Sequence, residues 1–124
     1  RDLGCAVLFI SHHLGVIAEL CDRVVVMYAG AVVESGTVRE IFHNPKHPYT
    51  RRLIECDPGH IKARARILPT IPGEVPDLAN LPDGCIFRDR CDQAVARCAQ
   101  VPPLTRLSEG HNAACWLNHA EEVA

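Results

Sequence analysis

The sequence predicts an α/β fold over residues 1–56, followed by a small irregular cysteine-rich extension over residues 57–124. A continuous apolar run of strand length opens the chain, a helix-spaced segment follows it, and two more strand-like segments come next. After Asp57-Pro58-Gly59 the composition changes, because seven of the nine prolines and four of the seven cysteines lie in residues 57–124. This change places the boundary between the two parts at residue 57.

Composition narrows the class of protein. A chain of 124 residues is one ordinary domain or two small ones. Hydrophobic residues make up 48% and charged residues 23%, which argues against wholesale disorder. No apolar run approaches the roughly 20 residues that span a bilayer. The net charge of −2 gives no support to a nucleic-acid partner. The chain opens without Met or a signal peptide, so we expect it to be part of a longer protein.

The first elements of the α/β part are predicted to be a buried strand and a helix. Residues 5–10 are apolar without alternation, which is typical of a strand covered on both faces in a parallel sheet. We expect Ser11 to cap the helix that follows. Apolar residues recur at helical spacing from Leu14 to Arg23. A strand of this kind needs neighbours that residues 1–56 do not supply, so this part is not expected to be stable alone.

The following elements are predicted to be a hairpin and two short helices. Residues 23–28 and 31–36 read as antiparallel strands around an Ala29-Gly30 turn. Thr37 and Glu40 have the spacing of a capping box for a helix over 38–42. Prolines at 45 and 48 end it, and a last helix is predicted over 49–55.

Two histidines lie where the predicted buried strand meets the first helix. Ligands of open α/β sheets bind at the carboxyl ends of strands, so His12 is placed to reach a phosphate above the sheet. The alternative is that His12 and His13 are solvated loop residues. Joint binding of one metal is disfavoured, because adjacent side chains point in different directions.

An ordered series of motifs resembles a known family over nearly the whole chain. Residues 8–30, from Leu8-Phe9-Ile10-Ser11-His12-His13 to Met27-Tyr28-Ala29-Gly30, resemble the switch region of ABC transporter ATPases. The oligopeptide/dipeptide importer subfamily is indicated by Val33-Glu34-Ser35-Gly36, by Ile41-Phe42-His43-Asn44-Pro45-Lys46-His47-Pro48-Tyr49-Thr50-Arg51, by Ile71-Pro72-Gly73-Glu74-Val75-Pro76 and by the cysteine series. The resemblance implies that residues 1–56 are the C-terminal part of a P-loop ABC ATPase domain.

The resemblance also implies a catalytic and ATP-binding role for His12. The family's switch histidine hydrogen-bonds the γ-phosphate of ATP, and an imidazole N–H can stabilise charge on a transferring phosphoryl group. The family usually has Asp at the next position, where this chain has His13. An acidic side chain at the start of a helix interacts favourably with the helix dipole, and His13 lacks this interaction. The sequence contains no Gly-x-x-x-x-Gly-Lys-Ser/Thr loop, no Walker B pair and no signature motif. The parent is therefore expected to be a transport-coupled ATPase using ATP with Mg, and this chain alone to be inactive.

Four cysteines in the extension, with spacing Cys-x5-Cys-x6-Cys-x16-Cys, are the predicted metal ligands: Cys85, Cys91, Cys98 and Cys115. From spacing alone, zinc and an iron–sulfur cluster rank equally, since the gaps exceed those of most zinc sites. The resemblance favours [4Fe–4S], with zinc as the alternative. A small proline-rich segment also benefits from a metal, because metal binding contributes folding free energy. The other cysteines, Cys5, Cys21 and Cys56, are predicted to pack on apolar faces.

Three other residues of the extension each have two possible roles. His111 either donates a hydrogen bond to a thiolate or is an ordinary loop residue. Arg88 and Arg90 either offset thiolate charge or face solvent.

The resemblance implies partners and a location. They are a second ATP-binding subunit, membrane permease subunits and, indirectly, a solute-binding protein, at the cytoplasmic face of the cell membrane. The alternative function is an independent metal- or iron–sulfur-binding module without nucleotide chemistry.

Overall fold

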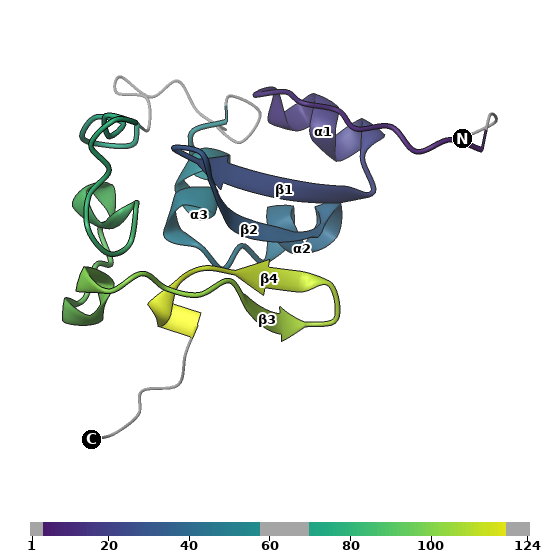
Figure 1. Ribbon diagram of the computed structural model, residues 1–124. Coiled ribbons are helices and arrows are strands. Elements are labelled where there is room, and N and C mark those ends of the chain that lie inside the picture. The colour runs from purple at the N-terminus through teal and green to yellow at the C-terminus, as the bar shows by residue number, and fades with distance from the viewer. Residues whose placement is uncertain (1–3, 58–69, 119–124) are drawn as a thin grey trace.

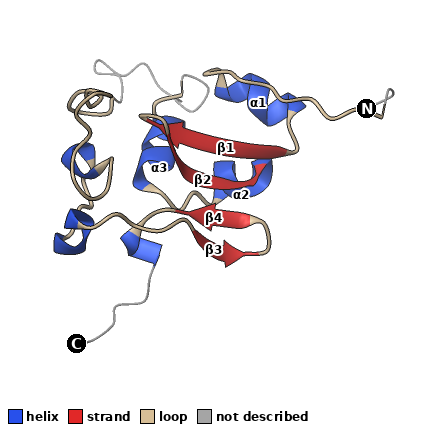
Figure 2. Cartoon of the chain, in the orientation of Figure 1, coloured by secondary structure: helices blue, strands red, loops and turns tan. Residues whose placement is uncertain are grey.

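The computed structural model describes residues 4–57 and 70–118 (Figure 1). Its elements follow in the order α1 (Leu14–Leu20), β1 (Arg23–Tyr28), β2 (Ala31–Thr37), α2 (Val38–His43), α3 (Pro48–Glu55), β3 (Thr105–Ser108) and β4 (His111–Ala113). Within the described residues, 3-10 turns lie at Arg88–Arg90, Ala96–Ala99 and Trp116–Asn118. The stretch from residue 70 to residue 104 is otherwise loop (Figure 2). Among the described helices, none has the length and apolar character needed to cross a membrane.

One four-stranded sheet joins the two predicted parts of the chain. The strand order is β1-β2-β4-β3, and every neighbouring pair is antiparallel. The α/β class is therefore confirmed, but the sheet is antiparallel rather than parallel. Strand β4 pairs with β2 through Glu34↔Ala113 and Ser35↔Asn112, so the extension continues the sheet that the hairpin begins. In Figure 1 the yellow-green β3–β4 hairpin lies directly beside the blue β1–β2 hairpin.

The strand predicted over residues 5–10 does not form. This segment is extended but unpaired, and Val7, Leu8 and Ile10 are each at least 80% exposed. The physical reason is that a strand covered on both faces needs neighbouring strands, and the described residues place none beside this segment. The helix that follows, α1, ends at Leu20 rather than Arg23 and has no buried residue.

The β1–β2 hairpin confirms the predicted turn. Ala29 and Gly30 both have positive φ, 47° and 84°. Positive φ at both central residues is typical of the two-residue turn whose twist matches that of antiparallel strands. The register runs from Arg23↔Thr37 to Tyr28↔Ala31, with one irregularity between Val26 and Met27.

Helix α2 begins where its predicted capping box places it, and α3 begins at Pro48, one residue before its predicted start. The Glu40 amide donates to Thr37 Oγ1 over 3.2 Å, and the Thr37 amide donates to Glu40 Oε2 over 2.8 Å, which completes the capping box of α2. The hydrogen bond from the Thr37 amide is the main cause that lowers the pKa of Glu40. Helix α3 has Pro48 at its first position and His47 as its cap.

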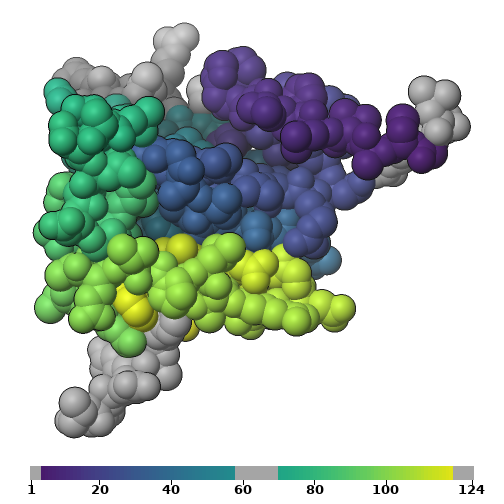
Figure 3. Space-filling model, in the orientation of Figure 1, coloured from purple at the N-terminus to yellow at the C-terminus, as the bar shows by residue number. Residues whose placement is uncertain are grey.

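The core lies between the first hairpin, α2 and the loop that contains Phe87. Phe87 is 1% exposed and packs edge-on against Tyr28, with ring centroids 5.2 Å apart. Residues of both predicted parts make up the buried cluster: Val26, Tyr28, Val33, Ile41, Cys85, Phe87 and Cys98. In the space-filling view the extension covers one end and one edge of the first hairpin (Figure 3). The aromatic contacts of Phe87 thus give the extension a hydrophobic anchor in the hairpin.

Candidate functional site

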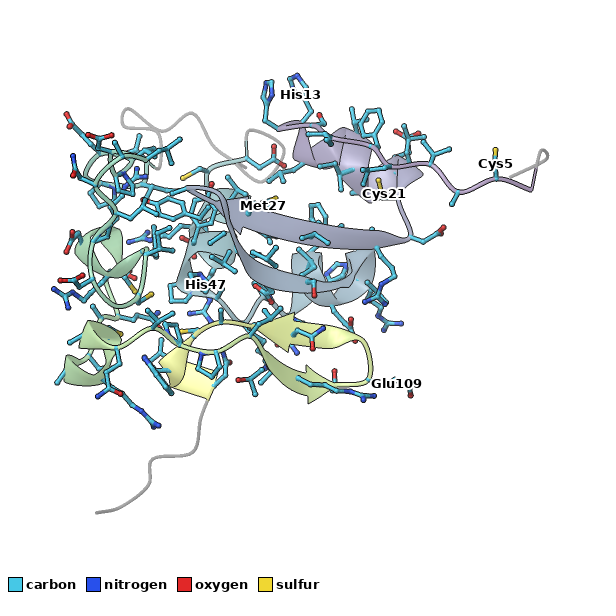
Figure 4. All side chains as sticks on the ribbon, viewed as in Figure 1. Cys5, His13, Cys21, Met27, His47 and Glu109 are labelled. Carbon is cyan, nitrogen blue, oxygen red and sulfur yellow. The ribbon has the colours of Figure 1, made fainter. Side chains whose placement is uncertain are left out.

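His12 and His13 lie on the surface just before α1. Both are exposed, and their rings stack with centroids 4.3 Å apart (Figure 4 labels His13). The Ser11 side chain does not cap α1 as predicted. Instead, Ser11 Oγ accepts the His13 amide over 3.0 Å, and His13 occupies the N-cap position without a side-chain capping bond. The serine hydroxyl therefore shapes the turn into the helix but leaves the first turn of α1 uncapped.

The surroundings of His12 contain no buried side chain. We refer to residues 5–20 as the His12 segment, and every one of them is exposed or half-buried. An exposed imidazole offers a donor and an acceptor to an incoming ligand without first breaking a contact within the protein. His12 is thus an accessible side chain on a segment that has no buried residue.

The four cysteines of the extension gather at the hydrophobic core. Cys85, Cys98 and Cys115 are buried and Cys91 is half-buried. The Cys85 amide donates to the carbonyl of Cys98 over 2.9 Å, which joins the two segments. Burial is the main cause that raises the pKa of the Cys115 thiol to about 11, and charge on Cys85, Cys91 and Cys98 contributes to the same shift. Burial likewise raises the pKa values of Cys85 and Cys91. The thiols of Cys85, Cys91 and Cys115 are therefore protonated at neutral pH.

The placement of these thiols is not that of an assembled metal centre. Zinc and iron–sulfur clusters require thiolates directed at one ion or one inorganic core. Within residues 4–57 and 70–118, no three His, Cys, Asp or Glu side chains are arranged to hold a metal ion. The four cysteines are residues of the type that binds zinc or an iron–sulfur cluster, but their arrangement in this structure does not match either one. The metal site at these four cysteines therefore stays a prediction.

The remaining three cysteines lie outside this cluster, and the two arginines of the extension have different roles. Cys5 is exposed rather than packed on an apolar face, and Cys21 and Cys56 are half-buried. Arg88 lowers the pKa of Cys85, although less than burial raises it. Arg90 instead holds three groups of the first part and the extension together: it donates to Tyr28 Oη, to the Ile71 carbonyl and to the Pro72 carbonyl.

A buried carboxylate forms a polar network among the described residues, and this network was not predicted from the sequence. Glu34, on β2, is fully buried. Its Oε1 lies 2.7 Å from His111 Nε2 and accepts the Lys46 amide over 2.7 Å, while its Oε2 accepts the His47 amide over 3.1 Å. We call these four residues the Glu34 network. His111 is therefore neither a partner of a thiolate nor an ordinary loop residue, because its imidazole binds a carboxylate on the neighbouring strand.

No local pattern could have revealed this contact, because Glu34 and His111 are 77 positions apart. The one available signal was a charged residue directly after the apolar run Ala31-Val32-Val33 in the second strand of the hairpin. Buried charged groups are costly unless they are hydrogen-bonded, so a glutamate in a covered strand calls for partners elsewhere in the chain.

Comparison with known proteins identifies relatives of the whole chain. Residues 33–98 match the family described as "Oligopeptide/dipeptide transporter, C-terminal region". The chain is 50% identical over 125 residues to the probable D,D-dipeptide transport ATP-binding protein DdpD of Escherichia coli, a match that covers 100% of this chain and 38% of that protein. It is 52% identical over 120 residues to a putative peptide import ATP-binding protein of Brucella ovis, covering 92% of the chain and 36% of the relative.

A further relative extends the same relationship to oligopeptide transport. The oligopeptide transport ATP-binding protein OppD of Salmonella typhimurium is 43% identical over 116 residues, covering 94% of the chain and 34% of that protein. The chain thus spans well under half the length of each of these relatives. From the family match and the identity over its full length, the chain belongs to the family of ATP-binding proteins of oligopeptide/dipeptide ABC transporters.

Proposed function

We propose that this chain is the C-terminal part of an ATP-binding subunit that powers import of a peptide or related solute through an ABC transporter. The observation that supports it most is the match over the entire chain to relatives named as peptide-transport ATP-binding proteins. Its partners would be a second ATP-binding subunit and membrane permease subunits, with a solute-binding protein engaged indirectly. Its place would be the cytoplasmic face of the cell membrane.

Within that subunit, His12 is proposed to contact the γ-phosphate of ATP. An imidazole N–H directed at the transferring phosphoryl group would stabilise the charge that develops there. The exposed position of His12 before α1 supports this role, since the ring is accessible to a ligand. The sequence has no phosphate-binding loop of the Gly-x-x-x-x-Gly-Lys-Ser/Thr type. ATP and Mg would therefore be held by groups outside this chain, and residues 1–124 alone would not hydrolyse ATP.

A chimera tests the proposed role of His12. In OppD of Salmonella typhimurium, the segment matching this chain is replaced by residues 1–124, and ATP turnover and peptide uptake are measured. We expect the chimera to be active and His12→Ala to lower turnover by about 100-fold or more, the range of a lost transition-state donor. His13→Ala is the matched control, because it removes the adjacent exposed ring and should retain turnover within a few-fold. Unchanged turnover in His12→Ala would remove the catalytic role.

We further propose that Cys85, Cys91, Cys98 and Cys115 are ligands of a metal centre, a [4Fe–4S] cluster or, as the alternative, zinc. The chemistry of four neighbouring thiols supports this, although their present arrangement does not enclose an ion. A cluster or zinc would add folding free energy to the extension, and no step of ATP hydrolysis is assigned to it.

Anaerobic purification tests the metal proposal and separates the two functions considered for the chain. Iron, sulfide and zinc are quantified with the visible spectrum, and Cys98→Ser is compared with Cys56→Ser, a cysteine outside the set. Iron and sulfide lost only in Cys98→Ser would support the cluster, and zinc without iron would leave the alternative ion. Metal in a chimera without turnover would favour an independent metal-binding module.

A further inference from the structure

Two segments of the extension meet at Cys85 and Cys98. The Cys85 amide donates to the Cys98 carbonyl oxygen over 2.9 Å. In a β-sheet, residues joined by such a bond have Cα atoms about 5.5 Å apart. A Cβ at Gly84 would lie 2.4 Å from the same carbonyl oxygen, so the two segments are in close backbone contact. Disulfides join Cα atoms roughly 4.4–6.8 Å apart, and the spacing of these two cysteines therefore suits one.

The side chains of both cysteines turn into the same hydrophobic core. Each residue is 7% exposed, and both belong to the buried cluster that contains Tyr28 and Phe87. Side chains that enter one core from two bridged segments lie on the same side of the bridge, as a disulfide also requires. Cys98 Sγ accepts the Val95 amide over 3.5 Å, and sulfur is a weak acceptor. We therefore expect the two sulfurs to meet through rotation of the side chains.

The requirements of a disulfide are met more closely by this structure than those of a metal centre. A disulfide needs two sulfurs, whereas zinc and iron–sulfur clusters need several donors directed at one point. In residues 4–57 and 70–118, no three side chains of the metal-binding types are arranged in that way. The mismatch with a metal leaves Cys85 and Cys98 as a pair of neighbouring buried thiols, whose chemistry is oxidation.

We propose that Cys85 and Cys98 form a reversible disulfide when the metal-free chain is exposed to hydrogen peroxide, which makes the extension redox-sensitive. The Cys98 thiolate attacks one peroxide oxygen, the O–O bond breaks, and the leaving hydroxide takes up the proton that the thiol released. The Cys85 thiolate then attacks the resulting sulfenic sulfur, and the second hydroxide leaves with the Cys85 proton. One peroxide is thus reduced to two water molecules, and two thiols are oxidised to one disulfide.

Burial determines the rate of this reaction, and the closed loop determines its effect. Buried thiols react only as their surroundings open, so we expect oxidation to take much longer than for an exposed cysteine. The disulfide would close a loop of about 14 residues that contains Phe87, the hydrophobic anchor of the extension. Cross-linking a loop of this length restricts the unfolded chain and should lower its unfolding equilibrium constant by about 100-fold. Oxidation would therefore fasten the extension more firmly to the first hairpin.

Peptide mapping of the full chain tests the pairing directly. The protein is reduced, stripped of metal with a chelator, checked for residual iron and zinc, and exposed to hydrogen peroxide. Free thiols are then blocked with N-ethylmaleimide. Trypsin cleaves after Arg88, Arg90, Arg97 and Arg106, which places the four cysteines of the extension on separate peptides. We expect mass spectrometry to find the Cys85 peptide linked to the Cys98 peptide, with two hydrogens lost and full reversal by dithiothreitol.

Single variants and a zinc-loaded sample provide the controls. Cys85→Ser and Cys98→Ser should each abolish the linked peptide and the 100-fold change in the unfolding equilibrium constant. Cys56→Ser, a half-buried cysteine outside the pair, should change neither. Zinc added before the peroxide should protect the pair if the proposed metal centre forms. Correct pairing without protection by zinc would contradict the metal centre and leave the disulfide standing.

Three results would overturn the proposal. The first is linkage of Cys98 to Cys91 or Cys115 in place of Cys85. The second is a mixture of all pairings, which would show that the folded chain selects none. The third is oxidation of single thiols to sulfinic acid without any linked peptide. The map of the unsubstituted chain decides among these even where a serine variant does not fold.

Discussion

The His12 segment and the Glu34 network differ in how the chain builds them. The His12 segment carries the residue that local motif reasoning selects, yet none of its side chains is buried. The Glu34 network has no local motif, yet it joins β2, β4 and the start of α3 through a fully buried carboxylate. The recognisable local motif therefore lies on an exposed segment, whereas long-range polar contacts join segments that are far apart in the sequence. Four changes, from the largest expected effect to the smallest, test this contrast.

Removing the carboxylate should have the largest effect. Glu34→Ala leaves the His111 imidazole and the Lys46 and His47 amides without their acceptor in a buried site. We expect the free energy of unfolding to fall by about 3–5 kcal/mol, measured by urea denaturation. Glu34→Gln keeps one acceptor oxygen and should cost clearly less. A loss below about 1 kcal/mol for Glu34→Ala would show that the network does not hold the sheet together.

Acidification should destabilise the same region through His47. Burial depresses its folded-state pKa from 6.5 to about 4, so the unfolded chain binds the proton more readily. Its contribution is complete above pH 6.5 and is lost as the pH falls toward 4. We expect up to about 3 kcal/mol to be lost over this window. His47→Asn should lose less over the same range, and identical pH profiles would contradict the assignment.

Two glycines with similar backbone angles should differ because their surroundings differ. Gly84 has φ +79°, and a Cβ there would lie 2.4 Å from the carbonyl oxygen of Cys98, whereas Gly30 has φ +84° and open space around it. We expect Gly30→Ala to cost about 1 kcal/mol from backbone strain alone. Gly84→Ala should cost at least about 2 kcal/mol, since the extension must also shift. Equal unfolding midpoints for the two variants would argue against close packing at Gly84.

Replacing His13 by Asp should have the smallest effect. His13 is the N-cap of α1 and makes no side-chain capping bond, while Asp both caps a helix and suits its dipole. We expect a gain of about 0.3–1 kcal/mol in the local stability of α1, read from hydrogen exchange of its amides. Slower exchange confined to α1 would fit its light packing, and faster exchange there would contradict the capping argument.

Local sequence patterns predicted the elements whose causes are local. The Ala29-Gly30 turn and the Thr37–Glu40 capping box depend on neighbouring residues, and both are present. Pro48, by contrast, begins α3 and does not end α2, which stops at His43. The prediction of a strand over residues 5–10 was wrong. An apolar run indicates that a segment is suited to burial, but it does not say which other segments would cover it. The pairing of β2 with β4 and the Glu34–His111 contact were not predicted, since they join residues far apart in sequence. The role of His12 and the metal at the four cysteines stay predictions.

Glu34 and His111 are expected to act as one unit that fixes the extension to the first hairpin. A double-mutant cycle of Glu34→Ala and His111→Ala, measured by urea denaturation of the full chain, tests it most directly. We expect the double variant to be destabilised by less than the two single variants combined, with a coupling free energy of about 2 kcal/mol. Additive effects, with coupling below about 0.5 kcal/mol, would mean that the two residues stabilise their segments independently.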